Sequence, residues 1–185
     1  MMRELADNIL DIAQNAVAAK ATLLEIALAL STAQDRITLQ FCDNGCGMSP
    51  EMVGAVADPF TTTRKTRKVG LGLPLLKQTA LMTGGTFDIE SEVGRGTKVS
   101  VSFGLSHIDR PPLGDVAAAL YTLVLLNPQM DFVFDCRCDE RSFVFDTRVI
   151  RKTIEPLEID CPEVSEWVQG YLKQEIELLL GGNIA

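Results

Sequence analysis

The sequence lacks any hydrophobic run long enough to cross a membrane. Its longest apolar stretch, residues 116–126, is about half of the roughly 20 residues that a transmembrane helix needs. The first residues, Met-Met-Arg-Glu-Leu-Ala-Asp, already read as amphipathic, so no signal peptide is expected. We therefore expect a cytoplasmic protein that does not contact a membrane.

Histidine and paired cysteines are also scarce. The chain has one histidine, His107, and its five cysteines are scattered, with no CxxC pair and no Cys/His cluster. This pattern argues against a zinc site and indicates free thiols in a reducing compartment. Basic residues are outnumbered, 17 against 25 acidic ones, which gives a net charge of −8. Nucleic acid and anionic membranes are therefore not expected as main partners.

The first hundred residues alternate between helical and strand patterns. Apolar spacing predicts a helix over 3–20, and Ser49 and Pro50 indicate the start of a second helix over 50–56; a third is predicted over 73–82. Strands are predicted over 23–30, 36–42, 86–91 and 97–103, with Ile37, Leu39 and Phe41 alternating in the second. The segment 58–69, polar and basic, is expected to be a loop. Residues 1–104 are thus predicted to form one α/β (α+β) domain, a two-layer sandwich with helices on one face of a mixed or antiparallel sheet.

A second, smaller unit is expected after a linker at 105–112, where Pro111 and Pro112 disfavour both helix and strand. Residues 113–185 predict a small α+β module: helices over 114–126 and 162–180, a hairpin over 131–137 and 142–148, and a third strand over 157–160. The apolar stripe of the last helix, which includes Trp167 and Tyr171, fits core packing or a partner surface.

The stretch from Asp43 to Met48, with the sequence DNGCGM, carries the clearest chemical signal. It follows a predicted strand and places a carboxylate before two glycines. The carboxylate can accept a hydrogen bond from an exocyclic amine, and the glycines let the backbone approach a flat ring. Alone, the pattern also fits a glycine-rich turn after a strand.

Two other short patterns can serve a nucleotide. Asp11 and Asn15 are four residues apart and share one helix face, where an amide oxygen can bind Mg²⁺ and a carboxylate can accept a proton, although both also fit a solvated face. The run Gly70-Leu71-Gly72-Leu73 opens a helix, whose N-terminus favours phosphate oxygens. The only dense cationic run, 64–68, precedes it and reads as a lid that closes on a triphosphate.

These patterns together resemble the histidine-kinase-type ATP-binding domain (the GHKL superfamily, with the Bergerat fold), which gyrase subunits, MutL proteins and anti-sigma kinases share. The resemblance covers about residues 4–103 and rests on five motifs in the family's order: Asp11 to Asn15, Asp43 to Gly47, Asp58 to Thr62, Gly70 to Leu73, and Gly94 to Thr97. No family is identified for the remainder of the chain.

The resemblance implies a role for each matching residue. Asn15 would bind Mg²⁺, Asp43 would accept the adenine amino group, Thr97 would contact the adenine edge, and Asp11 would be the general base. The other implied ATP-binding residues are Gly45, Gly47 and Met48 near the base, Phe60, Thr61, Thr62, Lys65 and Lys68 in the lid, and Gly70, Leu71, Gly72 and Leu73 at the phosphates.

Three functions follow from the resemblance and stay open at this point. The first is a signalling protein kinase that acts in trans on a His or Ser/Thr of a partner, because the phosphoacceptor helix pair of histidine kinases is not found and His107 lies in the linker. The second is an ATP-dependent switch that binds a partner protein. The third is a slow ATPase that forms a homodimer. Asp11 stands where hydrolytic relatives have Glu, and this difference affects the expectation of ATP hydrolysis more than that of nucleotide binding.

Overall fold

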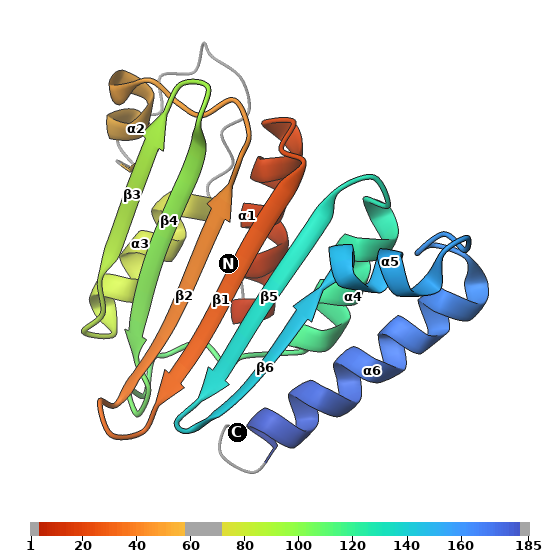
Figure 1. Cartoon of the computed structure of the whole chain (residues 1–185). Helices are drawn as coiled ribbons and strands as arrows, with labels where there is room; N and C mark the ends of the chain where they lie inside the picture. The colour runs from red at the N-terminus through yellow and green to blue at the C-terminus, as the bar shows by residue number, and fades with distance from the viewer. Residues whose placement is uncertain (1–3, 58–71, 182–185) are drawn as a thin grey trace.

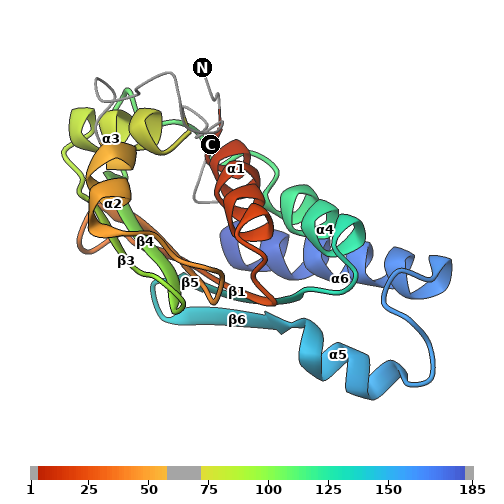
Figure 2. The same ribbon diagram turned by 90° about the horizontal axis from the view of Figure 1, so that it is seen from above.

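The computed structural model describes residues 4–57 and 72–181, and in this part the chain forms one mixed sheet with helices on one face (Figures 1 and 2). The strand order is β3-β4-β2-β1-β5-β6. The strands are β1 (Leu23–Ser31), β2 (Arg36–Asp43), β3 (Phe87–Glu92), β4 (Gly96–Gly104), β5 (Asp131–Cys138) and β6 (Arg141–Asp146). The predicted α/β sandwich is confirmed.

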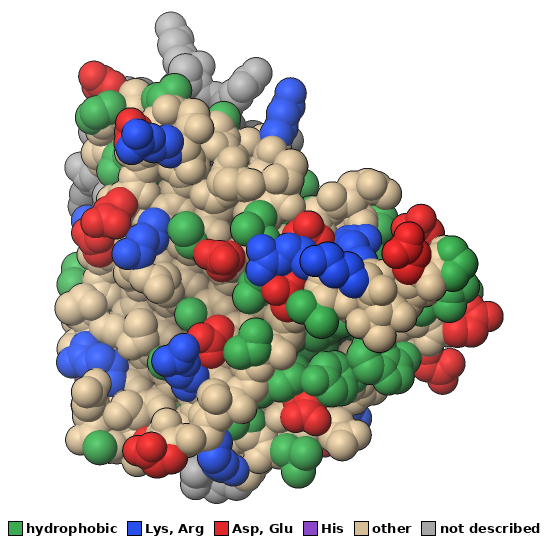
Figure 3. Space-filling model, in the orientation of Figure 1, with side chains coloured by type: hydrophobic (Ala, Val, Ile, Leu, Met, Phe, Trp, Pro, Cys, Tyr) green, Lys and Arg blue, Asp and Glu red, His purple; other side chains and the backbone are tan. Residues whose placement is uncertain are grey.

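The helices of the described part are α1 (Leu5–Ala18), α2 (Pro50–Ala57), α3 (Gly72–Met82), α4 (Val116–Leu126), α5 (Thr147–Ile154) and α6 (Pro162–Leu180). Figure 2 shows α1, α3, α4 and α6 above the same face of the sheet. The strands alternate accordingly: in β2, Ile37, Leu39 and Phe41 are buried beneath the helices. The other face, which Figure 3 shows, is mostly polar. None of the described helices is long and apolar enough to cross a membrane.

The C-terminal part of the chain extends the same sheet. β5 pairs in parallel with β1, with Leu23 opposite Asp131 and Leu30 opposite Cys138. α4 packs on both α1 and α6, and residues from both parts share one hydrophobic core. The predicted linker at 105–112 contains neither helix nor strand, yet the sheet and the core continue past it. Whether residues 113–185 form a unit of their own stays a prediction.

Two predictions of C-terminal strands are wrong: one strand is shorter than predicted, and the other predicted segment is not a strand. The strand expected over 142–148 ends at Asp146, whose carboxylate accepts a hydrogen bond from the Arg148 N–H at 2.9 Å and so caps α5. Thr147 is buried and accepts a hydrogen bond from the Phe132 N–H at 2.9 Å, which fixes the start of α5 on β5. Residues 157–160, predicted as a strand, form turns before α6.

Candidate functional site

The helix α1, which carries Asp11 and Asn15, is held at both ends. The N–H groups of Leu5 and Ala6 donate hydrogen bonds to the carbonyls of Pro112 and Leu113, each at 2.9 Å. At the other end, the carbonyl of Ala19 accepts a hydrogen bond from the Cys46 N–H at 2.9 Å. The bonds from Leu5 and Ala6 use donors that a helix N-terminus otherwise leaves unpaired. They fix α1 between the 105–112 segment and the loop that contains the two glycines.

Asp11 and Asn15 differ in exposure. Asn15 is exposed, so its amide oxygen is accessible to a cation, whereas Asp11 is half-buried. Desolvation raises the pKa of the Asp11 carboxyl above its ordinary value. A carboxylate with a raised pKa is a stronger base, which fits the predicted proton-accepting role.

Asp43 lies at the end of β2, directly opposite Thr97 on β4. Its Oδ1 accepts a hydrogen bond from the Gly45 N–H at 2.8 Å. Partial burial raises the pKa of Asp43, and hydrogen bonds from the backbone N–H groups of Gly45 and Thr97 lower it in part. The structure thus brings together Asp43 and Thr97, the two residues that the resemblance assigns to adenine recognition.

Gly45 and Gly47 allow the loop after β2 to pack closely against Ala19 and Glu92. Gly47 has a φ of +64°, and a Cβ there would collide with the carbonyl of Glu92. At Gly45, an added Cβ would lie 2.7 Å from the Cβ of Ala19. The positive φ disfavours any residue with a side chain, and the close contacts exclude one unless the backbone moves. The glycines therefore pack this loop between the end of α1 and the β3–β4 hairpin.

Ser91 is a site residue that the sequence did not indicate. Its Oγ accepts a hydrogen bond from the Met48 N–H at 2.8 Å, donates one to the Gly96 carbonyl at 2.8 Å, and lies 2.9 Å from the Oγ1 of Thr97. Because a hydroxyl has a single hydrogen, Thr97 is the donor in the last pair. The lone pairs of the Thr97 hydroxyl then stay available to another donor. Only the pairing of Ser91 with Thr97 across β3 and β4 could have revealed this role.

Asn44 is a second residue whose role the sequence did not indicate. Its Oδ1 accepts hydrogen bonds from the N–H groups of Thr22 and Leu23, at 2.8 and 3.0 Å, and its Nδ2 donates one to the Thr22 hydroxyl at 2.9 Å. These bonds attach the loop after β2 to the start of β1. The side chain of Asn44 is thus committed to holding the loop in place.

An open hollow of about 580 Å³ lies beside Asp43 and Thr97. Its walls include Ser91 and Gly96 from the hairpin and Val53 from α2. The volume lies within the range of roughly 300–1,000 Å³ that is typical of small-molecule sites. Asp11 and Asn15 are not part of the described lining of this hollow.

The predicted phosphate-binding residues are only partly described. Gly72 and Leu73 form the buried start of α3. Phe60, Thr61, Thr62, Lys65, Lys68, Gly70 and Leu71 lie outside the described residues. Within residues 4–57 and 72–181, no cluster of three His, Cys, Asp or Glu side chains is placed to hold a metal ion.

Sequence comparisons relate the chain to kinases. Sporulation kinase D of Bacillus subtilis is 36% identical over 98 residues, which are 53% of this chain and 19% of that protein. A probable C4-dicarboxylate sensor kinase of the same organism is 33% identical over 78 residues, which are 42% of this chain and 15% of that protein. The chain therefore spans less than a fifth of the length of these relatives.

The fold is similar to that of the MutL ATPase domain of Aquifex aeolicus, solved in complex with ADP. The TM-score is 0.51 at 19% identity, and the match covers 79% of this chain and 64% of the other. This coverage exceeds what residues 1–107 alone can supply, so the likeness includes part of the chain after the predicted linker. Residues 1–107 match the model of one protein family. The chain belongs to the histidine kinase-, DNA gyrase B- and HSP90-like ATPase family.

Proposed function

We propose that this chain binds ATP with Mg²⁺ and is the ATP-binding part of a signalling protein kinase that phosphorylates a separate partner protein. The observation that carries the proposal is the placement of Asp43 and Thr97 side by side at an open hollow of ligand size. Membership in the ATPase family and the similarity to sensor kinases support it. The family match makes ATP the expected nucleotide, and the relatives favour phosphate transfer to protein.

Asp43 would select adenine over guanine. Its Oδ1 is engaged by the Gly45 N–H, which fixes the carboxylate plane, and the remaining lone pairs of the carboxylate would accept the adenine amino group. Guanine has a carbonyl at that ring position, which a carboxylate would repel. The Thr97 hydroxyl, with its hydrogen committed to Ser91, would accept a hydrogen bond from the base or from an intervening water.

Asn15 and Asp11 would act at the phosphate end. The exposed amide oxygen of Asn15 would bind Mg²⁺, which neutralises phosphate charge when it is present. Asp11, one turn earlier on the same face, would accept the proton of the attacking hydroxyl, imidazole or water. Its raised pKa suits that role, because the carboxylate holds a proton more readily than an ordinary aspartate does.

A second candidate, an ATP-dependent switch, rests on the attachment of α1. The helix that would contact Mg²⁺ is hydrogen-bonded to residues 112 and 113 and packs on α4. A shift of α1 on ATP binding would therefore reach the C-terminal part of the sheet. ATP would change the affinity for a partner only if ATP itself has different affinities for the chain with α1 in the one position and in the other.

Incubation with γ-labelled ATP, with and without a cell extract, separates these functions. Label on a second protein supports the kinase, free phosphate indicates an ATPase, and saturable binding without either indicates the switch. The variant Asp11→Asn should bind ATP like the wild type but transfer no label. Absence of ATP binding would refute all three functions.

A further inference from the structure

Within residues 4–57 and 72–181, the outer strand β6 leaves one row of backbone groups without a strand partner. It ends the sheet, so only β5 pairs with it. The Asp131 N–H donates to Thr22 beside β1, and the Phe132 N–H donates to Thr147 on the opposite side, each at 2.9 Å. Backbone N–H groups of successive residues point to opposite sides of a strand. The N–H and C=O groups of the even-numbered residues of β5 therefore point toward β6. The backbone groups of their partners, Arg141, Phe143 and Phe145, therefore point toward β5. The backbone N–H groups of Ser142, Val144 and Asp146 point away from the sheet.

The two edges of the sheet differ in how they discourage pairing. Edge β3 carries three exposed carboxylates, Asp88, Glu90 and Glu92, whereas a helix packs on each edge strand, α2 on β3 and α6 on β6. Charged side chains and a covering helix are common protections of an edge strand. Edge β6 instead carries Val144 at its centre, and 57% of this side chain is exposed.

An apolar groove of about 610 Å³ follows this edge. Its walls are Val144 and Phe145 from β6, Val149 and Ile154 from α5, and Trp167 and Tyr171 from α6. The two aromatic rings stack with centroids 5.1 Å apart and planes 8° apart, yet Trp167 is 51% exposed. Figure 3 shows this apolar surface as the green patch on the right.

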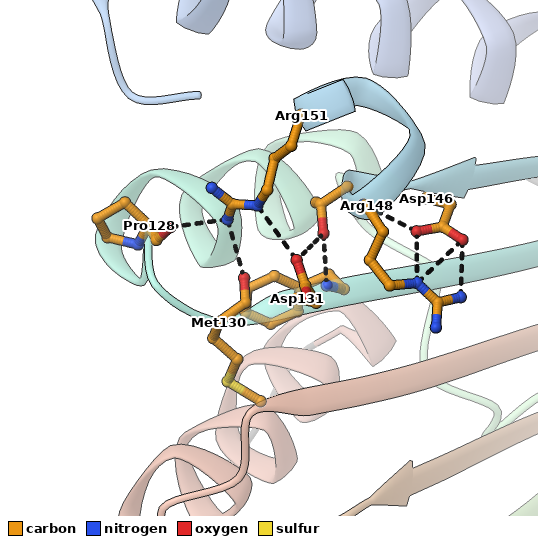
Figure 4. Close-up of polar contacts among 8 residues, drawn as sticks. Pro128, Met130, Asp131, Asp146, Arg148 and Arg151 are labelled. Atoms are coloured by element: carbon orange, nitrogen blue, oxygen red, sulfur yellow. Dashed lines mark hydrogen bonds and ion pairs between the residues drawn. The ribbon is translucent and has the colours of Figure 1, made fainter. Parts of the chain in front are cut away.

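The α5 wall of the groove is held in place by polar contacts. The Arg151 guanidinium donates to the Asp131 carboxylate at 3.1 Å and to the carbonyls of Pro128 and Met130 at 2.7 and 3.2 Å (Figure 4). These contacts join the middle of α5 to the start of β5. The groove is therefore formed before anything binds, which lowers the entropic cost of binding.

The two ends of the groove carry opposite charge. The end near Trp167 is the more acidic one, because Glu163 lies one turn before it on α6 and residues 153–172 contain five carboxylates, against Lys152 in the last turn of α5. The other end has the exposed Arg141, whose guanidinium donates to the Leu178 carbonyl at 3.1 Å. An occupant with a basic residue at the Trp167 end complements this charge.

We propose that this groove binds an extended peptide segment of a partner protein as a seventh strand beside β6. The peptide would present apolar side chains at every second position and a Lys or Arg at the acidic end. An extended backbone is the occupant that satisfies the outward groups of Ser142, Val144 and Asp146, and alternate side chains would enter the groove. A second copy of this chain would bring its own α5 and α6 to the same edge, where they would meet those of the first.

Selection from a random peptide library displayed on phage tests this proposal. Enriched peptides should show apolar residues at alternate positions and one basic end. On binding of the synthetic peptide, amide exchange at Val144 should slow by about tenfold or more, as expected for a new hydrogen bond. Trp167, the only tryptophan, should report saturation by its fluorescence. N-methylation of alternate peptide amides should weaken binding by about tenfold or more.

The matched variants are Val144→Lys, which places a charge on the edge, and Val93→Lys, the same change at an exposed valine in the β3–β4 turn. The first should lose peptide binding and the second should keep it. The proposal is wrong if no peptide is enriched, if enriched peptides show helical spacing, or if N-methylation has no effect. It is also wrong if the chain dimerises in sedimentation and Val144→Lys abolishes the dimer. The assay contains no nucleotide, so its failure would leave the proposed ATP-dependent function standing.

Discussion

Replacement of Asp43 by Asn tests adenine recognition with the smallest possible change. The amide can keep its oxygen on the Gly45 N–H, where the Asp43 carboxylate now accepts at 2.8 Å. Its NH₂ group then takes the place of the second carboxylate oxygen. The adenine amino group would meet a donor in place of an acceptor, whereas the carbonyl of guanine would meet a suitable donor.

The size of the effect follows from the loss of a hydrogen bond to a charged group. Such bonds contribute about 1.5–3 kcal/mol, which corresponds to a loss of about 10- to 150-fold in affinity. Calorimetric titration with ATP and with GTP measures both the loss and the change in selectivity. The control is Asp88→Asn, which removes an exposed carboxylate on β3 and should leave both affinities unchanged. Equal ATP affinity in wild type and Asp43→Asn would refute the assignment.

Three further predictions concern the loop, the base and the C-terminal part. Gly47→Ala should destabilise the fold by about 1–2 kcal/mol or more in chemical unfolding, because it combines a φ of +64° with a backbone collision, whereas Gly84→Ala, with a φ of +71° and open space, should lose only the conformational part. Asp11→Asn should raise the thermal midpoint at neutral pH, because the folded state raises the pKa of Asp11 and so disfavours the ionised carboxylate. The gain in thermal midpoint should vanish below the ordinary Asp pKa of about 3.9. An equal gain at low pH would contradict this explanation. A chain cut after residue 112 should show no cooperative unfolding by circular dichroism, because β1 would lose β5 and α1 would lose α4; a cooperative transition would show that residues 1–112 form a unit of their own.

The sequence predicted the elements of the N-terminal part well because their signals are local. Ile37, Leu39 and Phe41 alternate, and the structure buries all three in β2. The carboxylate before two glycines is equally a local pattern. The position of Asp43 opposite Thr97 could not be derived from it, because strand pairing joins residues that are far apart in the chain. The motif order of the family supplied what local physics could not.

The C-terminal part was harder to predict for two physical reasons. The parallel pairing of β5 with β1 follows a long crossover through α4, and no local pattern specifies which strand receives it. The helix α5 has the sequence TRVIRKTI, which is rich in β-branched residues that favour strands. Its helical state depends on the Asp146 cap and on the contacts of Arg151, which are tertiary interactions. The contact of Ser91 with Thr97 was not predicted because it, too, is a tertiary interaction.

We expect the nucleotide to bind beside the ends of β2 and β4. The most direct measurement is a titration of the isotope-labelled chain with MgATP, followed by the amide NMR signals of each residue. Binding at this site should give saturable shifts concentrated at Asp43 to Met48, at Thr97 and at Asn15, with little change at β6. Saturable shifts that leave Gly45, Gly47 and Thr97 unchanged, or no shifts at all, would contradict it.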